Sequence, residues 1–298
     1  MATYNGERFL AEQLDSILSQ SYPNIELVIV DDDSIDGTVA LVNVYITRYP
    51  HISLYVNEQN LGYIKNFEKG MLLAKGELIA LSDQDDIWRS DKLAVLMDQM
   101  DNHEIIYSDS ALIDDTGKSL DKKMSDIRTQ ISYDDCLMYT IGAWAPGHAM
   151  LLKKELIARC IPFPKLVTHD FWLGFVATCM SPIKYLNIPL VYYRQHSTNA
   201  IGADTHAHKS NLQKSTRKEK LYQSRARMQL LYEKCPPENV EQKKVLGTLC
   251  NSYQSFSLNN NWIRMTTFFK YQDKILAYKN KSELMKVLFC LKMFFKID

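Results

Sequence analysis

Two short apolar runs, each ending in a cluster of carboxylates, constrain the fold of this chain more than any other feature. Residues 25–30, Ile-Glu-Leu-Val-Ile-Val, lead into Asp31, Asp32 and Asp33. Residues 76–81, Gly-Glu-Leu-Ile-Ala-Leu, lead into Ser-Asp-Gln-Asp-Asp-Ile-Trp at 82–88. Short apolar runs bounded by turn residues are typical of buried strands. Both acidic clusters are therefore expected where a strand leaves the core.

Helical patterns separate these strands. Residues 7–19 place their apolar side chains on one helical face, and further helices are expected at 37–49 and 63–74, with a strand at 52–56. The alternation predicts an α/β fold, a mostly parallel sheet flanked by helices and connected by right-handed crossovers. Ligands of such sheets bind beyond the carboxyl ends of the strands, so both acidic clusters are expected on one rim.

The second half of the chain has weaker patterns. We expect, in order, a helix at 88–100, a strand at 104–109, a flexible loop at 114–135, a strand leading into a helix at 149–158, a buried helix at 170–179, and short strands at 183–186 and 190–193. From about residue 209 the pattern is helical. We therefore divide the chain into an α/β domain, 1–208, and a helical C-terminal region, 209–298.

The acidic run at 82–88 predicts a metal site. Asp83, Asp85 and Asp86 repel one another unless a cation lies between them. Oxygen ligands suit Mg²⁺ or Mn²⁺, and these ions usually also bind substrate phosphates. The run therefore indicates a divalent-metal site for a diphosphate-bearing substrate, and a solvated loop with an Asx turn is the alternative.

Charge is distributed unequally along the chain. Residues 209–298 hold 18 Lys and Arg against 7 Asp and Glu, a net charge of +11, and residues 1–208 hold 17 against 28, a net charge of −11. A basic, aromatic tail suits an anionic membrane surface, where each nearby Lys or Arg contributes about 1 kcal/mol. Residues 284–295 fit a surface-lying amphipathic helix. Helices packed on the first domain, or forming a homodimer contact, are the alternatives.

Other patterns narrow the class of protein. No run of 18 apolar residues and no signal peptide are present, so no membrane-spanning helix is expected. The six cysteines have neither Cys-x-x-Cys nor zinc-site spacing, which favours reduced thiols in a cytosolic protein. A Gly-x-x-x-x-Gly-Lys phosphate loop is also lacking, which counts against another phosphoryl-transfer enzyme. No nucleic-acid partner is expected.

Four sequence blocks together resemble the family 2 glycosyltransferases. They are residues 2–10, residues 18–38, Asn60-x-Gly62-x-x-x-Asn66-Phe67, and residues 82–88. The resemblance covers about residues 1–200 and is closest to bacterial rhamnosyltransferase-like enzymes of surface polysaccharide synthesis. Family members usually begin with a complete strand before the Thr-Tyr-Asn block, and this chain starts almost inside it. A central ladder partner and part of the nucleotide pocket are therefore expected to be missing.

The resemblance implies a GT-A fold and an inverting transfer of a sugar from a nucleotide-diphosphate donor, with a dTDP- or UDP-sugar as the expected donor. The acceptor would be a hydroxyl of a glycan or lipid-linked glycan in O-antigen or capsule synthesis. Mg²⁺ or Mn²⁺ would assist the transfer. The protein would be cytoplasmic, with the inner face of the plasma membrane as its docking surface. A non-catalytic nucleotide-sugar-binding or scaffold protein with this fold is the alternative.

The resemblance also implies roles for individual residues on the donor side. Asp31 or Asp32 would accept hydrogen bonds from the base, and Asp83 would lie near the ribose. The full nucleotide-sugar set is Thr3, Tyr4, Glu7, Asp31, Asp32, Lys65, Asp83 and Arg194. The metal set is Asp85, Asp83 and His196, the last from the block at 193–199.

A general base is implied by the block at 168–172, Thr-His-Asp-Phe-Trp. The acceptor hydroxyl must lose its proton, so a carboxylate is expected opposite the leaving group, and Asp170 takes this role. The alternative is that Asp170 only caps the following helix. His169 is expected to be a neighbouring pocket residue. The acceptor side is expected to include Trp144, Gly147 and His148.

Overall fold

The amino-terminal third forms a three-stranded parallel sheet with order β1-β2-β3 and its covering helices. The computed structural model describes residues 1–196 and 216–296. The strands of this sheet are β1 (Ala2–Thr3), β2 (Leu27–Asp31) and β3 (Ile52–Val56), and the helices are α1 (Glu7–Leu18), α2 (Thr38–Arg48) and α3 (Tyr63–Leu73). The bounds of the other five elements confirm the predictions for this part of the chain, whereas the two-residue strand β1, which pairs with β2, was not predicted.

A six-stranded sheet follows, with order β4-β8-β6-β9-β5 and with β7 paired to β6. Its strands are β4 (Leu78–Ala80), β5 (Ile87–Trp88), β6 (Ile105–Ile113), β7 (Ser119–Lys123), β8 (Met150–Lys153) and β9 (Lys184–Arg194). Only β6 and β9 pair in parallel within it, so this sheet is mixed where a mostly parallel one was predicted. The backbone N–H of Ala2 donates to Ser82 O at 3.2 Å and links the two sheets.

Short helices flank the second sheet. They are α4 (Lys92–Asp98), α5 (Met124–Ile127), α6 (Glu155–Cys160) and α7 (His169–Thr178), with the 3₁₀ turns η1 (Cys136–Tyr139) and η2 (Gly147–Ala149). Helix α7 is buried along almost its whole length, as the continuous apolar run at 170–179 predicts. It leads from the interior of the fold to the β9 strand.

Two sequence predictions for this half were wrong. The stretch 114–135 is not a structureless loop, because β7 turns back onto β6 through Gly117, whose φ of 86° suits glycine, and α5 follows. The predicted strands at 183–186 and 190–193 form one strand, β9. Register shifts opposite Asp109 accommodate Pro189, which has no N–H for the ladder.

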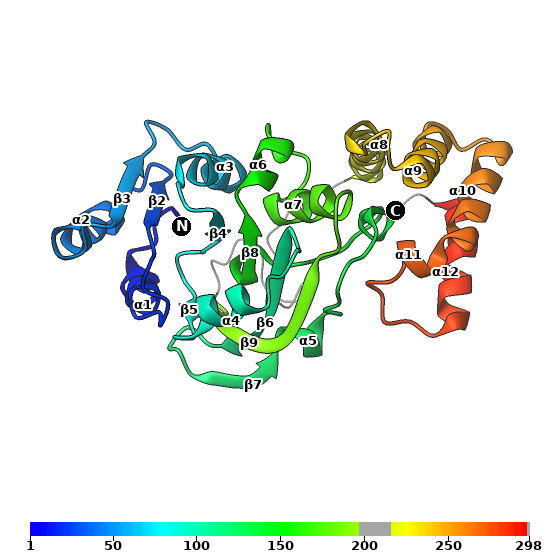
Figure 1. The fold of residues 1–298 in the computed structure, drawn as a ribbon. Coiled ribbons are helices and arrows are strands. Elements are labelled where there is room, and N and C mark those ends of the chain that lie inside the picture. The colour runs from blue at the N-terminus through cyan, green and yellow to red at the C-terminus, as the bar shows by residue number, and fades with distance from the viewer. Residues whose placement is uncertain (197–215, 297–298) are drawn as a thin grey trace.

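Five helices complete the chain: α8 (Arg217–Lys234), α9 (Val240–Tyr253), α10 (Leu258–Lys270), α11 (Gln272–Ile275) and α12 (Glu283–Phe295). They lie at the end of the molecule opposite α2 and β3 (Figure 1). Leu231 and Leu246 belong to the same buried cluster as Leu137 and Trp172, so the helices share a core with the α/β part. The predicted boundary at 208/209 lies outside the described residues.

No helix in the described ranges 1–196 and 216–296 has both the length and the apolar character that crossing a bilayer requires.

Candidate active site

The two acidic clusters meet at the carboxyl ends of β1, β2 and β4. Thr3 Oγ1 donates to Asp31 Oδ2 at 2.7 Å. The side-chain amide of Gln84, within the second cluster, forms two hydrogen bonds with the Tyr4 backbone. Tyr4 N donates to Gln84 Oε1 at 2.8 Å, and Gln84 Nε2 donates to Tyr4 O at 3.0 Å. Residues 3 and 4 thus lie between the clusters, and the prediction of one shared rim is confirmed.

Asp31 and Asp32 are buried and hydrogen-bonded within the protein. Asp31 also accepts from Ser34 N at 2.8 Å and from Ser34 Oγ at 2.7 Å. Asp32 Oδ1 accepts from Leu61 N at 2.8 Å, and Asp32 Oδ2 accepts from Gly62 N at 2.9 Å. These bonds fix the loops on either side of the rim, and the role of both carboxylates toward a base stays a prediction.

The other predicted nucleotide residues line the outer part of the rim. The Tyr4 ring is 48% exposed, which leaves it accessible for stacking. Glu7 Oε2 accepts from Gly37 N at 2.8 Å, at the start of α2. Lys65 forms an ion pair with Glu68 at 2.5 Å. A phosphate that binds Lys65 would therefore compete with a carboxylate for the same ammonium group.

A group of side chains that could hold a metal ion lies on the rim. Ligand atoms of Asp83, Asp86 and His148 all lie within 4.8 Å of one another. Asp85 and His196, which were predicted as ligands with Asp83, lie next to each other, with 2.9 Å between Asp85 Oδ2 and His196 Nε2, and their role toward a metal stays a prediction. The rest of the His196 block, residues 197–199, lies outside the described residues.

The electrostatics of this cluster favour a cation. Burial, together with the neighbouring carboxylates of Asp85 and Asp170, raises the pKa of Asp83 to about 7. Burial, with Asp85 and Asp83, also raises the pKa of Asp86 well above its usual range. Asp86 Oδ2 is buried and has no hydrogen-bond partner among the described residues. An orphaned carboxylate oxygen beside a second carboxylate is what a divalent ion would satisfy.

His148 is available as a nitrogen ligand. Burial, together with the nearby Lys92, lowers its pKa to about 3, so the ring is neutral near pH 7. Its Nε2 lies 2.8 Å from Ser110 Oγ, and the ring stacks on Tyr193 with 4.4 Å between centroids. Sequence analysis placed His148 on the acceptor side. The fold instead brings its ring to Asp83 and Asp86, and nothing in the local sequence indicates that placement.

Sequence analysis missed Lys92 entirely. Its side chain is fully buried, and Nζ donates to His148 O at 2.7 Å and lies 3.5 Å from the Trp88 ring centroid. Burial lowers the pKa of Lys92 well below its usual range, while Asp86 and Asp83 raise it. The one available signal was a lysine on the apolar face of a helix, four residues before Leu96. It places a buried amine beside the group formed by Asp83, Asp86 and His148.

Arg194 organises the acidic loop. Its Nε donates to Asp85 O at 2.8 Å, its backbone N donates to Asp86 Oδ1 at 3.2 Å, and its Nη2 donates to Glu12 Oε2 at 2.6 Å. The residue is 1% exposed, and its guanidinium lies over the Phe9 ring. These contacts give it a positioning role, and its predicted contact with a diphosphate remains untested.

Asp170 stands at the start of α7, behind the metal cluster. Its Oδ1 accepts from Phe171 N at 2.7 Å and from Thr168 Oγ1, while Thr168 occupies the N-cap position. No hydrogen bond to Oδ2 is found among the described residues. Asp170 is also close enough to Asp83 to contribute to raising the pKa of that carboxyl. One oxygen of Asp170 therefore fixes the helix start, and its role as the general base stays a prediction.

The predicted acceptor residues separate. Gly147 packs on His169 and Asp170. Trp144 instead contacts Arg128, whose Cζ lies over the Trp144 ring, 4.4 Å from the ring centroid. His169 is buried and stacks on Phe67, and neither of its ring nitrogens has a hydrogen-bond partner among the described residues. Gly147, His169 and Asp170 thus form one wall of the site.

Gly147→Ala is expected to damage activity more than folding. A Cβ at this position would lie 2.7 Å from His169 Nε2 and 3.6 Å from Asp170 Cβ, so this wall must shift. Overpacking typically costs about 1–3 kcal/mol, and a misplaced catalytic group can cost about 100-fold in rate. Gly70→Ala is the matched control, since its Cβ would meet only Val30 at 3.4 Å. Equal kcat for both variants would contradict this placement.

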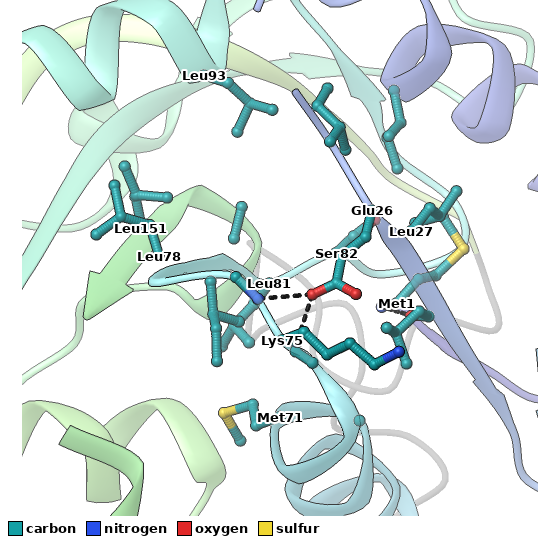
Figure 2. Close-up of a pocket in the computed structure, with 18 of the residues that line it drawn as sticks. Met1, Glu26, Leu27, Met71, Lys75, Leu78, Leu81, Ser82, Leu93 and Leu151 are labelled. Atoms are coloured by element: carbon teal, nitrogen blue, oxygen red, sulfur yellow. Dashed lines mark hydrogen bonds between the residues drawn. The ribbon is translucent and has the colours of Figure 1, made fainter. Parts of the chain in front are cut away.

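A separate cavity of about 520 Å³ lies between β2 and β4 (Figure 2). It is lined mainly by apolar residues, including Met1, Leu27, Leu78 and Leu81, and its wall also includes Glu26, whose carboxylate accepts from Gly76 N at 2.7 Å. None of Asp83, Asp86 and Asp170 lines it. The cavity is therefore distinct from the candidate site on the rim.

Comparison with known proteins agrees with this geometry. The model of the family "Glycosyl transferase family 2" matches residues 1–159. The chain is 33% identical to the dTDP-rhamnosyl transferase RfbG of Shigella flexneri over 224 residues, 68% of this chain and 74% of the relative. It is 26% identical to an uncharacterized glycosyltransferase of Nostoc sp. over 208 residues, 67% of this chain and 64% of that protein.

Solved structures share the fold. TarS 1–349 of S. aureus, in complex with UDP-GlcNAc, superposes with a TM-score of 0.59 at 18% identity and covers 99% of this chain and 79% of its own. The mannosyltransferase PcManGT of Pyrobaculum calidifontis, in complex with GDP-Man and Mn²⁺, gives a TM-score of 0.50 at 19% identity, with 98% and 77% covered. The acidic rim, the GT-A architecture and the family match together establish that this chain belongs to glycosyltransferase family 2.

Proposed function

We propose that this chain is a metal-dependent, inverting glycosyltransferase of bacterial surface polysaccharide synthesis. The donor would be a dTDP- or UDP-sugar, and the acceptor a hydroxyl of a glycan or lipid-linked glycan. One observation carries the proposal: the convergence of Asp83, Asp86 and His148 next to Asp170. The Shigella relative is named as a dTDP-rhamnosyl transferase, and a putative glycosyltransferase of Bacillus subtilis, 32% identical over 141 residues, is named for teichuronic acid biosynthesis. Both names support this substrate class.

The metal would be held by the two carboxylates and the neutral imidazole, with the Asp85–His196 pair beside them. Mg²⁺ or Mn²⁺ suits this donor set, because both prefer oxygen ligands and Mn²⁺ also accepts imidazole nitrogen. When bound, the ion offsets the charge that develops on the leaving diphosphate. The chain's own contribution is to orient these ligands: Arg194 and Lys92 fix the loop that carries them.

Asp170 would act as the general base. Its unbonded Oδ2 takes the proton of the acceptor hydroxyl as the oxygen attacks the anomeric carbon. A single displacement from the side opposite the leaving diphosphate inverts the anomeric configuration. Tyr4 would offer its exposed ring to the nucleotide base, and the wall of Gly147 and His169 would receive the acceptor. Residues 1–208 would form the catalytic domain and 209–298 its helical extension.

A thermal-shift panel tests the donor site. We expect one of dTDP, UDP or GDP to raise the melting temperature, and only with Mn²⁺, because a ligand of the folded state stabilises it by RT ln(1 + [L]/Kd). At a nucleotide concentration about 100 times Kd the gain is about 2.7 kcal/mol. EDTA should abolish the shift. An equal shift with EDTA, or none with any nucleotide, would count against a metal-bridged diphosphate.

The C-terminal helix α12 supports a membrane-docking role on the cytoplasmic face. Cys290 and Met293 are buried, and Arg264 Nε donates to Met293 O at 2.8 Å, so one side packs on α10. The large apolar side chains on its other side are exposed and follow i, i+4, i+7 and i+11 spacing: Leu284, Leu288, Leu291 and Phe295. Lys292 and Lys296 are exposed near the carboxyl end of this stripe, whereas Lys286 lies away from it and pairs with Glu283 and Asp273. An apolar stripe edged by lysines fits an anionic bilayer surface.

The double variant Leu288→Glu, Leu291→Glu is expected to lose binding to vesicles that contain phosphatidylserine, because it places two carboxylates on the apolar stripe. Both residues are exposed, so the core that α12 shares with α10 is left intact. Leu72→Glu, at an exposed position of α3, is the matched control and should bind as the wild type does. Cosedimentation with phosphatidylserine vesicles and with neutral vesicles measures the effect. Unchanged binding would reject the membrane role, and concentration-dependent self-association that the double variant abolishes would assign the stripe to a homodimer instead.

A further inference from the structure

Three cysteines converge where the α/β part of the chain meets the C-terminal helices. Cys136 begins η1, Cys179 follows the last residue of α7, and Cys235 follows the last residue of α8. Their Sγ atoms all lie within 4.8 Å of one another. Cys136 and Cys235 are buried, and Cys179 is partly exposed. Sequence spacing gave no sign of this cluster, because the three residues come from distant segments.

Hydrogen bonds from residues of the C-terminal region hold the three cysteine-bearing segments in place. Asn239 Nδ2 donates to Cys179 O at 2.8 Å, and Lys243 Nζ donates to Cys235 O at 2.7 Å. Asp135, the residue before Cys136, accepts from Lys274 Nζ at 2.5 Å. Each segment is thus tied to a residue of the C-terminal region, through a backbone carbonyl at Cys179 and Cys235 and through the Asp135 side chain next to Cys136. The sulfur atoms meet in a fixed arrangement rather than on mobile loops.

Cys235 is the thiol of the cluster that ionises most readily, because hydrogen bonds within the cluster and burial raise the pKa values of Cys136 and Cys179. Hydrogen bonds from the Cys136 and Cys179 thiols lower the pKa of Cys235, and the Lys243 ammonium lowers it further. Thiolate is the form that binds metals. Three thiolates around a divalent ion would carry one net negative charge, and the nearby cations Lys243 and Lys274 would offset it.

We propose that Cys136, Cys179 and Cys235 form a binding site for a thiophilic divalent metal ion, typified by Zn²⁺. Zn–S bonds of about 2.3 Å at tetrahedral angles set sulfur–sulfur distances of about 3.8 Å, so the sulfurs need to approach by at most about 1 Å. Each thiol releases its proton to solvent as it binds. Water occupies the fourth position, which the partial exposure of Cys179 allows.

The ion would join three elements that otherwise touch through side chains alone. It would fix the carboxyl end of α7, whose first turn carries Asp170, to η1 and to α8. Because such a site forms only in the folded state, its binding free energy adds to stability. This role is independent of the metal at Asp83 and Asp86, whose ligands contain no sulfur.

Co²⁺ substitution distinguishes the two sites, because only sulfur ligands give a thiolate-to-cobalt charge-transfer band in the near ultraviolet. We expect this band with one equivalent of Co²⁺ in the full-length, reduced protein, and its displacement by Zn²⁺. Zn²⁺ should also protect three thiols from a thiol reagent and raise the melting temperature. Cys235→Ser should lose the band and the protection, and Cys179→Ser, at the more exposed position, serves if that variant does not fold. Cys250→Ser, outside the cluster, is the matched control and should keep both.

Either of two results would overturn the proposal. The first is a Co²⁺ spectrum without the charge-transfer band, with all thiols equally reactive in the presence and absence of Zn²⁺. The second is a mass lower by two hydrogens in protein purified without reductant, mapped to two of the three cysteines. That mass would assign the cluster to a disulfide.

Discussion

Asp170→Asn is expected to lower kcat by about 10²–10⁴-fold, the usual contribution of a positioned general base, while donor and Mn²⁺ binding stay unchanged. Asn keeps an oxygen that can accept from Phe171 N, so the start of α7 should be preserved. It cannot take a proton from the acceptor hydroxyl. Initial rates of sugar transfer, with Mn²⁺-dependent nucleotide binding measured in parallel, test this expectation.

The control for this variant is Asp273→Asn, which neutralises an exposed carboxylate on α11. It should keep the wild-type rate. The pH dependence of kcat separates a catalytic role from a structural one. If Asp170 is the base, the ionisation of one acidic group should be missing from the pH profile of kcat in Asp170→Asn. A variant that loses melting temperature and rate together, with an unchanged pH profile, would indicate that Asp170 only caps the helix.

Asp83→Asn is expected to weaken Mn²⁺ binding by at least about 10-fold, because it removes one of two carboxylates from a site with three protein ligands. kcat/KM should fall with metal occupancy, and added Mn²⁺ should restore part of it. Asp33→Asn is the matched control: Asp33 is exposed in the other acidic cluster, and its φ of 68° suits Asn equally well. Mn²⁺ titration by electron paramagnetic resonance measures the free ion directly.

The same site predicts a pH dependence. Since the pKa of Asp83 is raised to about 7 without metal, a cation must displace its proton below that pH. Mn²⁺ affinity should therefore rise as the pH increases through about 7. In Asp83→Asn this rise should be much smaller. Identical pH dependence in both proteins would show that Asp83 does not contact the ion.

The amino-terminal fold could be predicted because its signals are local. Apolar runs that end in Asp31 and in Asp83 mark strand ends, and helical faces between them require crossovers. The second sheet was harder. β9 spans a proline that a bulge accommodates, and β7 is an exposed strand without alternation, so neither gives a clear periodic pattern. Both segments form strands because each pairs with β6 in the folded protein.

The site could be predicted only in part, for the same reason. The acidic run and the block around Asp170 are contiguous in sequence and were found. His148, Lys92 and Arg194 acquire their roles from burial and from partners distant along the chain. Asp86 belonged to the acidic run that predicted a cation site, and only the fold shows that it is buried with an Oδ2 that has no hydrogen-bond partner among the described residues. The cysteine cluster could not be predicted from the spacing of cysteines in the sequence, because its three residues come from separate elements.

Release of nucleoside diphosphate from dTDP- and UDP-sugars, with Mn²⁺ or with EDTA, tests the central claim most directly. The wild-type protein should release product from one donor only with metal, and Asp83→Asn and Asp170→Asn should both be strongly impaired. Metal-dependent binding without any release, across donors and acceptors, would favour a nucleotide-sugar-binding protein on the same fold. Undiminished release in Asp83→Asn with EDTA would contradict the metal-dependent mechanism at this rim.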